Sequence, residues 1–307
     1  MGRYVLRRLL QMVPVFLGTT LLIFVMVYAL GDPVAAFFGD RAPDPATAAR
    51  IRAELGLDQP LWRQYVDYLG RILTGDFGTA FNGRQVTELM TSAFPVTLRL
   101  TLVAFVIEMG FGVVLGVVSG LRRGRLVDTS VLAFTLLVIS VPTFVTGYLL
   151  QYLLGVRWNL VPPAVSPQAP LRELLLPGVV LALVSLAYVT RLTRTSVAEN
   201  ARADYLRTAV AKGLPRRRVV VRHLLRNSLV PVVTFLGVDI GTLMAGAIVT
   251  ERIFNIQGVG YHLWQGILRQ NSPTVVGFVT VLVLVFLFAN LLVDLLYAAL
   301  DPRIRYA

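Results

Sequence analysis

Three carboxylates interrupt long apolar stretches of this chain, in places where an ionised group is costly. They are Glu108, Asp239 and Asp294. A charge at the centre of a lipid bilayer costs at least ~2.5–3.5 kcal/mol, so each side chain is expected to face protein or water. Asp239 is the most central in its stretch and is the preferred candidate for lining a polar pathway across a membrane. The alternative is a buried, hydrogen-bonded acid that holds helices together, a role that suits Asp294 better.

The other polar residues form no familiar catalytic or metal-binding motif. The chain has no cysteine and two histidines, His223 and His262, that are well separated in sequence. Thiolate and paired-imidazole metal sites are therefore not expected. The sequence also lacks a His-Glu-x-x-His motif and a Gly-x-x-x-x-Gly-Lys-Ser/Thr phosphate loop. These features disfavour an intramembrane enzyme and argue against a P-loop ATPase.

The strongest functional signal is a basic segment, residues 191–227, that lies between two apolar stretches. It holds ten of the 29 Lys and Arg residues of the chain. So much charge between two membrane spans indicates a segment that a soluble partner grips. The alternative interpretation is a solvated basic loop near lipid headgroups. Three small residues favour the partner, because a merely solvated face has no need of them: Thr208, Ala209 and Gly213.

Local signals in this segment predict a helix, a tight turn and a second helix. Residues from Ser196 to Lys212 include neither Pro nor Gly and favour a helix. Gly213 and Pro215 then stop it, and a second helix is expected from about Arg216 towards the next apolar stretch. Four residues at steps of four are expected to share one face of the first helix: Val197, Ala201, Tyr205 and Ala209.

The composition requires a membrane protein. Of 307 residues, 56% are hydrophobic and only 15% charged, with a mean hydropathy of +0.70. Soluble domains carry about 25% charged residues. Long apolar blocks, without strand-type alternation, predict an all-α, polytopic fold. Six spans are expected: Leu9–Leu30, Leu100–Leu121, Thr129–Leu154, Leu174–Thr190, Ser228–Thr250 and Val275–Leu296. In the third, Thr143 and Phe144 beside Pro142 are candidates for pathway-lining residues at a helix irregularity.

The distribution of basic residues predicts the orientation. Connections on one side carry 18 of the 29 basic residues and a net charge of +14; they are residues 1–8, 122–128, 191–227 and 301–307. The connections on the other side carry a net charge of zero; they are residues 31–94, 155–173 and 251–273. Since excess Lys and Arg mark the cytoplasmic side, both termini and the basic segment are expected inside. The net charge of +12 is thus explained mainly by the membrane orientation of the chain, and attraction to anionic lipid is a second effect. Nucleic-acid binding is disfavoured.

The extracytoplasmic segment 31–94 is expected to contain two helices. Asp44 and Pro45 favour a helix start, and Gly56 a helix end. A second helix has one apolar face, which would lie along the membrane surface or pack on the spans as a small cap; that face comprises Leu61, Trp62, Tyr65, Tyr68, Leu69 and Ile72.

Two predicted spans carry small residues one turn apart. Such ridges let helix backbones approach closely, either within this chain or against a second membrane subunit. They are Gly112, Gly116 and Gly120 in the second span, and Gly237, Gly241 and Ala245 in the fifth.

The basic segment resembles a motif of the permease subunits of binding-protein-dependent ABC importers. The general motif is Glu-Ala-Ala-x-x-x-Gly, of which this chain keeps Ala209 and Gly213. Residues 204–209 (Asp-Tyr-Leu-Arg-Thr-Ala) and 211–214 (Ala-Lys-Gly-Leu) are close to the version of the dipeptide/oligopeptide branch, "B" type. The departure from the general motif leaves the fine geometry of the docking contacts open.

The resemblance extends along the whole chain. Branch-like motifs occur in order at residues 31–33 (Gly-Asp-Pro), 55–60, 75–79, 290–297 and 301–303 (Asp-Pro-Arg). At residues 271–273 (Asn-Ser-Pro), where relatives commonly have Asp-Tyr-Pro, this chain differs.

The resemblance implies a type I ABC importer permease fold, with residues 1–307 as one transmembrane domain in a bacterial plasma (inner) membrane. It implies a homologous second permease subunit, ABC ATPase subunits that bind ATP and Mg²⁺, and an extracytoplasmic substrate-binding protein. This chain would be non-catalytic, would hold no cofactor or metal, and would move peptides by alternating access. An ion- or proton-coupled secondary transporter is the alternative. The ATPase-coupling residues implied are Asp204, Tyr205, Thr208, Ala209, Lys212, Gly213 and Leu214.

Overall fold

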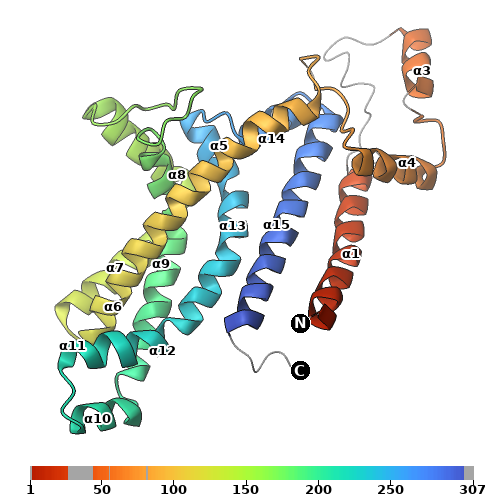
Figure 1. Cartoon of the computed structure of the whole chain (residues 1–307). Helices are drawn as coiled ribbons and strands as arrows, with labels where there is room; N and C mark the ends of the chain where they lie inside the picture. The colour runs from red at the N-terminus through yellow and green to blue at the C-terminus, as the bar shows by residue number, and fades with distance from the viewer. Residues whose placement is uncertain (1, 27–43, 55, 81, 301–307) are drawn as a thin grey trace. The chain divides into compact units, whose positions relative to one another are not determined.

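The computed structural model describes residues 2–26, 44–54, 56–80 and 82–300, and these residues form helices joined by turns (Figure 1). One isolated antiparallel bridge, Thr79 to Gln85, is the only strand-like pairing among them. Five helices are long and apolar enough to cross a membrane, or six if one bent pair counts as a single span. The all-α polytopic prediction is confirmed. The motifs at residues 31–33 and 301–303 lie outside the described residues.

The chain divides into two compact units. The first unit comprises Met1–Thr97 and Gln257–Ala307, and the second unit comprises Leu98–Ile256. The helix α5 (Val86–Ile107) continues from one to the other.

In the first unit, the terminal helices α1 (Gly2–Phe24) and α15 (Ser272–Leu300) pack together, and α14 (Val259–Leu268) packs on α15. The helix α15 covers the predicted sixth span. The predicted first span continues beyond residue 26, outside the described residues.

The helix α4 (Leu61–Thr74) is a cap packed on these spans. Its Tyr68 and Ile72 are buried with Ile23, Phe24 and Val276, and the Tyr68 hydroxyl lies 2.8 Å from the Thr280 hydroxyl. The sequence left two arrangements open for this helix, along the membrane surface or packed on the spans, and the structure shows the packed one. The residues at its start, Leu61 and Trp62, stay exposed.

The other predicted helix of this segment forms as α3 (Pro45–Glu54). The Thr47 amide donates to Asp44 Oδ2 at 3.2 Å, as a helix-capping aspartate requires. The stop is also confirmed, since Gly56 has a φ of +66°.

In the second unit, the helix α9 (Leu175–Asn200) is the central element. It contacts α6 (Val113–Leu121), α7 (Leu126–Ser140), α8 (Thr143–Leu150) and α13 (Val230–Phe254). The helix continues ten residues beyond Thr190, the expected end of this span, with Thr193 and Ser196 buried. Packing thus extends a helix past the point where apolar residues end.

The second predicted span begins earlier than expected. An apolar helical stretch runs from Val86 through α5, the π-helix η2 (Glu108–Gly112) and α6 to Leu121. Its 36 residues correspond to about 54 Å at 1.5 Å per residue, more than the ~30 Å of a bilayer core. Residues 86–94, assigned to the outside segment from sequence, are therefore part of this helix.

The glycine ridge of that span packs on α9 within the chain. A Cβ at Gly112 would lie 2.8 Å from Val189 Cγ1, and one at Gly120 would lie 2.8 Å from the Arg194 carbonyl oxygen. At Gly116 the Thr190 carbonyl oxygen would be only 2.6 Å away. Only glycine permits this approach, so the intrachain interpretation of this ridge is correct.

The third predicted span is sharply bent. The helix α7 ends at Ser140, and α8 starts at Thr143 and continues into the π-helix η3 (Gln151–Arg157), with an angle of 102° between the two parts. Pro142 cannot donate a helical hydrogen bond and holds Val141 extended (φ −100°, ψ 126°). The expected irregularity beside Pro142 is confirmed, and it takes the form of a sharp bend between two helices.

Candidate functional site

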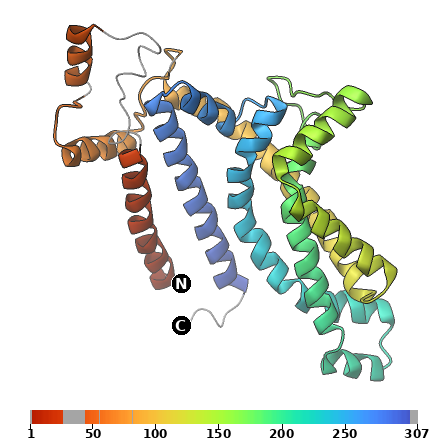
Figure 2. The same cartoon turned by 180° about the vertical axis from the view of Figure 1, so that it is seen from behind.

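The basic segment folds into a helical hairpin, which comprises α10 (Asp204–Ala211), α11 (Arg216–Arg218), η4 (Val219–Leu225) and α12 (Arg226–Ser228). Figures 1 and 2 show it at one end of the second unit, where α9 arrives and α13 departs. Helix, turn and helix are confirmed. The continuous helix from Ser196 is not, because α9 ends at Asn200 and a turn precedes α10.

Gly213 makes the tight turn of the hairpin. Its φ is +74°, a left-handed conformation that other residues adopt only at a cost. The Gly213 amide donates to the Val210 carbonyl at 2.9 Å, and the Leu214 amide donates to the Ala209 carbonyl at 3.3 Å. These bonds close the C-terminus of α10 and reverse the chain.

The hairpin has its own apolar core. Leu206 and Ala209 of α10 are buried against Val197, Val219 and Leu224, and partly buried side chains, including Val117 of α6, pack around them. The expected shared face of residues 197, 201, 205 and 209 is wrong, because the turn before α10 leaves Ala201 and Tyr205 exposed. Ala209 is small because it faces this core, so it offers little surface to a partner.

The exposed side of α10 presents polar groups at fixed positions. Asp204, Thr208 and Lys212 are exposed, and Tyr205 is 38% exposed. The Tyr205 hydroxyl donates to Asn200 Oδ1 at 2.9 Å, and the Thr208 hydroxyl donates to the Asp204 carbonyl at 3.1 Å. These bonds hold the face in one arrangement, as a contact surface for a rigid partner needs.

Sequence reasoning missed one member of this surface. Val210 is 63% exposed on the hairpin, an apolar side chain on an otherwise polar face. Val210 follows the inward-facing Ala209 and precedes the turn at Gly213, so the motif itself indicates that Val210 lies on the outer side of α10.

An ion pair at the base of the hairpin was also missed. Arg194 of α9 donates from Nε to Asp128 Oδ1 at 2.6 Å and from Nη2 to Asp128 Oδ2 at 2.8 Å. Asp128 also accepts from the Ser119 hydroxyl at 2.6 Å and from the Gly124 amide at 2.8 Å. The four bonds join the ends of α6, α7 and α9, so a force that moves the hairpin and α9 also reaches the α6–α7 pair.

Asp239 lies beside a second membrane-embedded carboxyl. Glu108 starts η2 and is completely buried, Asp239 of α13 is 5% exposed, and Ser185 of α9 is 8% exposed. Asp239 and Ser185 are polar neighbours of the Glu108 carboxyl. Neither Glu108 oxygen, nor Asp239 Oδ2, has a hydrogen bond of standard geometry to the described residues. Two adjacent carboxylates repel unless they share a proton or cation, so this cluster is polar, buried and only partly satisfied.

The remaining pathway candidates lie at the bend of the third span. Thr143 is the first residue of α8 and is half-buried, whereas Phe144 is 53% exposed. The α8 helix contacts α13, and the two helices are close at Gly147, where a Cβ would lie 2.7 Å from Ile253 Cδ1. The side chain of Asp294 lies outside the described residues.

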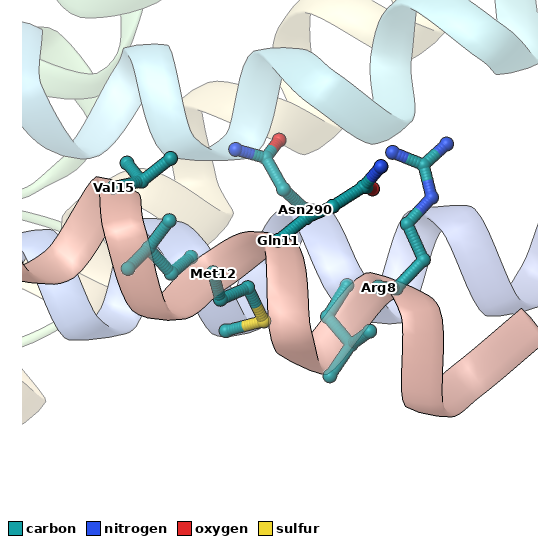
Figure 3. Close-up of a pocket in the computed structure, with 7 residues that line it drawn as sticks. Arg8, Gln11, Met12, Val15 and Asn290 are labelled. Atoms are coloured by element: carbon teal, nitrogen blue, oxygen red, sulfur yellow. The ribbon is translucent and has the colours of Figure 1, made fainter.

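A small hollow of about 160 Å³ lies between α1 and α15 in the first unit (Figure 3). The polar ends of Arg8, Gln11 and Asn290 point to one side of the two helices. Ligand pockets usually measure about 300–1,000 Å³, so this hollow by itself is too small to pass a peptide.

No group of three or more His, Asp and Glu residues within the described ranges is arranged to hold a metal ion. His262 is stacked against Phe278, with ring centroids 5.6 Å apart, which gives it a packing role.

Two family descriptions cover nearly the whole chain. Residues 112–306 match "Binding-protein-dependent transport system inner membrane component", and residues 1–101 match the N-terminal part of the membrane component of the same systems. The first match includes the hairpin, the Asp128–Arg194 pair and Asp239.

Several characterised or named proteins are similar over their full length. The dipeptide transport system permease protein DppB of Escherichia coli K12 is 37% identical over 337 residues, covering 100% of this chain and 99% of the relative. The di/tripeptide transport system permease protein DppB of Pseudomonas aeruginosa is 37% identical, with 99% and 98% covered. The glutathione transport system permease protein GsiC of Salmonella choleraesuis is 37% identical, with 100% of each covered. The chain therefore belongs to the family of inner-membrane permease components of binding-protein-dependent ABC transport systems, and it is a multi-pass protein of the inner membrane.

Proposed function

We propose that this chain is one of two permease subunits of an ATP-driven importer that carries di- or oligopeptides across the bacterial plasma membrane. The observation that carries the proposal is the full-length similarity to peptide permeases together with a structured hairpin at the position of the ATPase-docking motif. A packed core, a glycine turn and an ordered outer face are what a coupling element requires and a solvated loop does not.

The proposed orientation places both termini and the hairpin in the cytoplasm. The support is the excess of Lys and Arg on that side. The α3–α4 region then faces a substrate-binding protein on the outside. ATP and Mg²⁺ are bound by separate ATPase subunits, since this sequence has no phosphate loop.

Coupling is proposed to run through the exposed side of α10. Asp204, Tyr205, Thr208 and Lys212 would contact the ATPase directly, while Gly213 and Leu214 set the turn and Ala209 holds α10 to η4. When ATP closes the ATPase dimer, the hairpin moves as a body. Its flanks continue into α9 and α13, so these spans tilt and change the access of the pore from one side to the other.

The peptide route is proposed to include the polar cluster of Glu108, Ser185 and Asp239, and the bend at Thr143 and Phe144. An acidic pair suits the α-amino group of a peptide or an ordered water, because either supplies donors to oxygen atoms that have none in the described chain. The second permease subunit would complete the walls of the pore.

Reconstitution of the complete complex in proteoliposomes tests the function. Uptake of a labelled dipeptide should need the binding protein and ATP hydrolysis, and should be unchanged when an imposed proton gradient is collapsed. Uptake that follows the gradient and ignores ATP would replace the importer with an ion-coupled transporter.

A further inference from the structure

The turn between α6 and α7 contains an open, positively charged hollow of about 570 Å³. The residues that line it share one short stretch of chain: Arg122, Gly124, Arg125, Leu126, Val127 and Thr129. None of these residues lies on the exposed face of α10, which is proposed to contact the ATPase.

The positive charge at this turn forms no ion pair with the part of the chain that the structure describes. Arg122, Arg123 and Arg125 are exposed, and none of their side chains forms an ion pair with the described residues. Asp128 is the only acidic residue in the turn and the first turn of α7, and its carboxylate is held by Arg194. Because Asp128 is paired with Arg194, it does not neutralise Arg122 or Arg125, and these two side chains can bind an external anion.

The shape of the hollow is held by the same carboxylate. The Gly124 amide donates to Asp128 Oδ2 at 2.8 Å, and the Arg125 amide donates to the Arg122 carbonyl at 3.0 Å. Gly124 itself has a φ of +79°. Since the backbone of the turn is fixed on both sides, the two lining arginines start from defined positions around the hollow instead of moving on a mobile loop.

Apolar surface adjoins this charge. Leu126, the first residue of α7, is 86% exposed, and Leu121, the last residue of α6, is 46% exposed. Both helices belong to candidate spans, so the turn marks the place where the chain leaves the hydrocarbon. Figures 1 and 2 show α10 projecting further along the second unit than this turn. On the proposed orientation, the turn between these two spans lies at the cytoplasmic boundary, at the level of lipid headgroups, whereas α10 lies further from the spans.

We propose that the hollow at residues 122–129 binds the phosphate headgroup of an anionic phospholipid, with Arg122 and Arg125 on the phosphate and Leu126 beside the acyl chains. Basic pockets at the cytoplasmic ends of membrane helices suit such lipids, and guanidinium groups bind phosphate through paired hydrogen bonds. The inference rests on the proposed cytoplasmic orientation of this turn. A lipid here would brace the α6–α7 pair, which the Asp128–Arg194 bonds connect to α9.

The test compares two double variants of the full complex that remove the same charge. Arg122→Gln with Arg125→Gln alters the hollow, and Arg216→Gln with Arg217→Gln removes two exposed arginines of α11 that do not line it. Asp128 is retained in both, so the fold of the turn is preserved. Each complex is purified in mild detergent, titrated with phosphatidylglycerol or phosphatidylcholine, and examined by native mass spectrometry.

We expect the wild-type and Arg216/Arg217 complexes to retain phosphatidylglycerol in preference to phosphatidylcholine. The Arg122/Arg125 variant should bind phosphatidylglycerol roughly 10- to 30-fold more weakly, the effect expected for loss of two surface arginines. Equal retention by both variants would overturn the site, because it would show attraction by total charge alone. Loss of the ATPase subunit from the Arg122/Arg125 complex would also overturn it and assign the turn to that partner.

The lipid measurement needs no transport. Failure of the lipid site would leave peptide uptake dependent on ATP, whereas failure of the proposed function would leave lipid retention unchanged, so the two can be told apart.

Discussion

Arg194 and Asp128 lie 66 positions apart in the sequence and form a two-point ion pair, with N–O distances of 2.6 and 2.8 Å. Because Asp128 is 3% and Arg194 19% exposed, the pair is largely shielded from water. It ties α9, which leads into the hairpin, to the α6–α7 pair, and so defines the part of the second unit that should move together.

Removal of Asp128 should destabilise the permease. Asp128→Ala leaves Arg194 without its partner, and we expect a loss of about 2–3 kcal/mol, less than the ~3–5 kcal/mol of a fully buried pair because Arg194 retains some access to water. Thermal unfolding of the purified complex measures this. The exposed pair Arg84–Glu88, 48% and 58% exposed, provides the control, since Glu88→Gln should leave the unfolding midpoint nearly unchanged. Equal midpoints for the two variants would contradict the role of the ion pair.

A β-branched residue at Gly213 should uncouple ATP hydrolysis from transport. Gly213→Val places a β-branched residue at a φ of +74° with no atom within 4 Å of the added Cβ, so the strain is conformational and not steric crowding. The turn should rearrange, at a cost of roughly 1–2 kcal/mol, and peptide uptake should fall while the protein still inserts. Gly213→Asn is the matched control, because Asn tolerates this conformation. Unchanged uptake by the Val variant would refute the coupling role.

The contact between α6 and α9 should not accept even one methyl group. A Cβ at Gly116 would lie 2.5 Å from Thr193 Cβ and 2.6 Å from the Thr190 carbonyl oxygen. Gly116→Ala should therefore lower the unfolding free energy by about 1–3 kcal/mol, as overpacking does. Gly110→Ala, in the same long helix but with nothing within 4 Å, should have little effect. A harmless Gly116→Ala would mean that the two helices are further apart than described.

The two buried acids should behave as one unit. Asp239→Asn is expected to reduce transport more than assembly, and Glu108→Gln, which removes one of two adjacent like charges, should be tolerated in assembly. In the double variant the effects on uptake should not add, because each replacement changes the same contact. The measurements are uptake assays and size-exclusion profiles of the wild type, the two single variants and the double variant, which together form a double-mutant cycle. Loss of the complex in Asp239→Asn would instead indicate a structural acid.

Stability should depend on pH through His262. Burial, with a smaller contribution from Arg84, lowers the pKa of His262 from its ordinary value of 6.5. The folded protein therefore binds this proton less readily than the unfolded chain. The contribution of neutral His262 to the free energy of unfolding is complete above pH ~6.5 and is lost as the pH falls below that value. His262→Phe, which keeps a ring beside Phe278, should reduce the drop in unfolding midpoint between about pH 7.5 and about pH 5.5. An unchanged drop in the His262→Phe variant would mean that His262 is not the group responsible.

Local sequence signals were sufficient to identify the apolar helices and the turn at Gly213, although not every helix boundary. Apolar blocks of bilayer length need helices, since a helix satisfies its own backbone hydrogen bonds. Gly213 and Pro215 likewise end a helix for reasons contained in their own covalent structure. Asp44 with Pro45 specified the start of α3 in the same way. Each of these outcomes depends on residues within a few positions of one another.

Contacts between distant residues could be decided only by the tertiary structure. The inward direction of Ala209 depends on where η4 packs, and the extension of α9 beyond Thr190 depends on its neighbours. The sequence marked Glu108 and Asp239 as costly, but their positions 131 residues apart gave no sign that they meet. Asp128 and Arg194 were counted as loop charges until packing of α6, α7 and α9 joined them. Sequence determined which groups are charged and which segments are apolar; packing of helices far apart in the chain determined which charges pair, because periodicity specifies a face of a helix but not what lies opposite it.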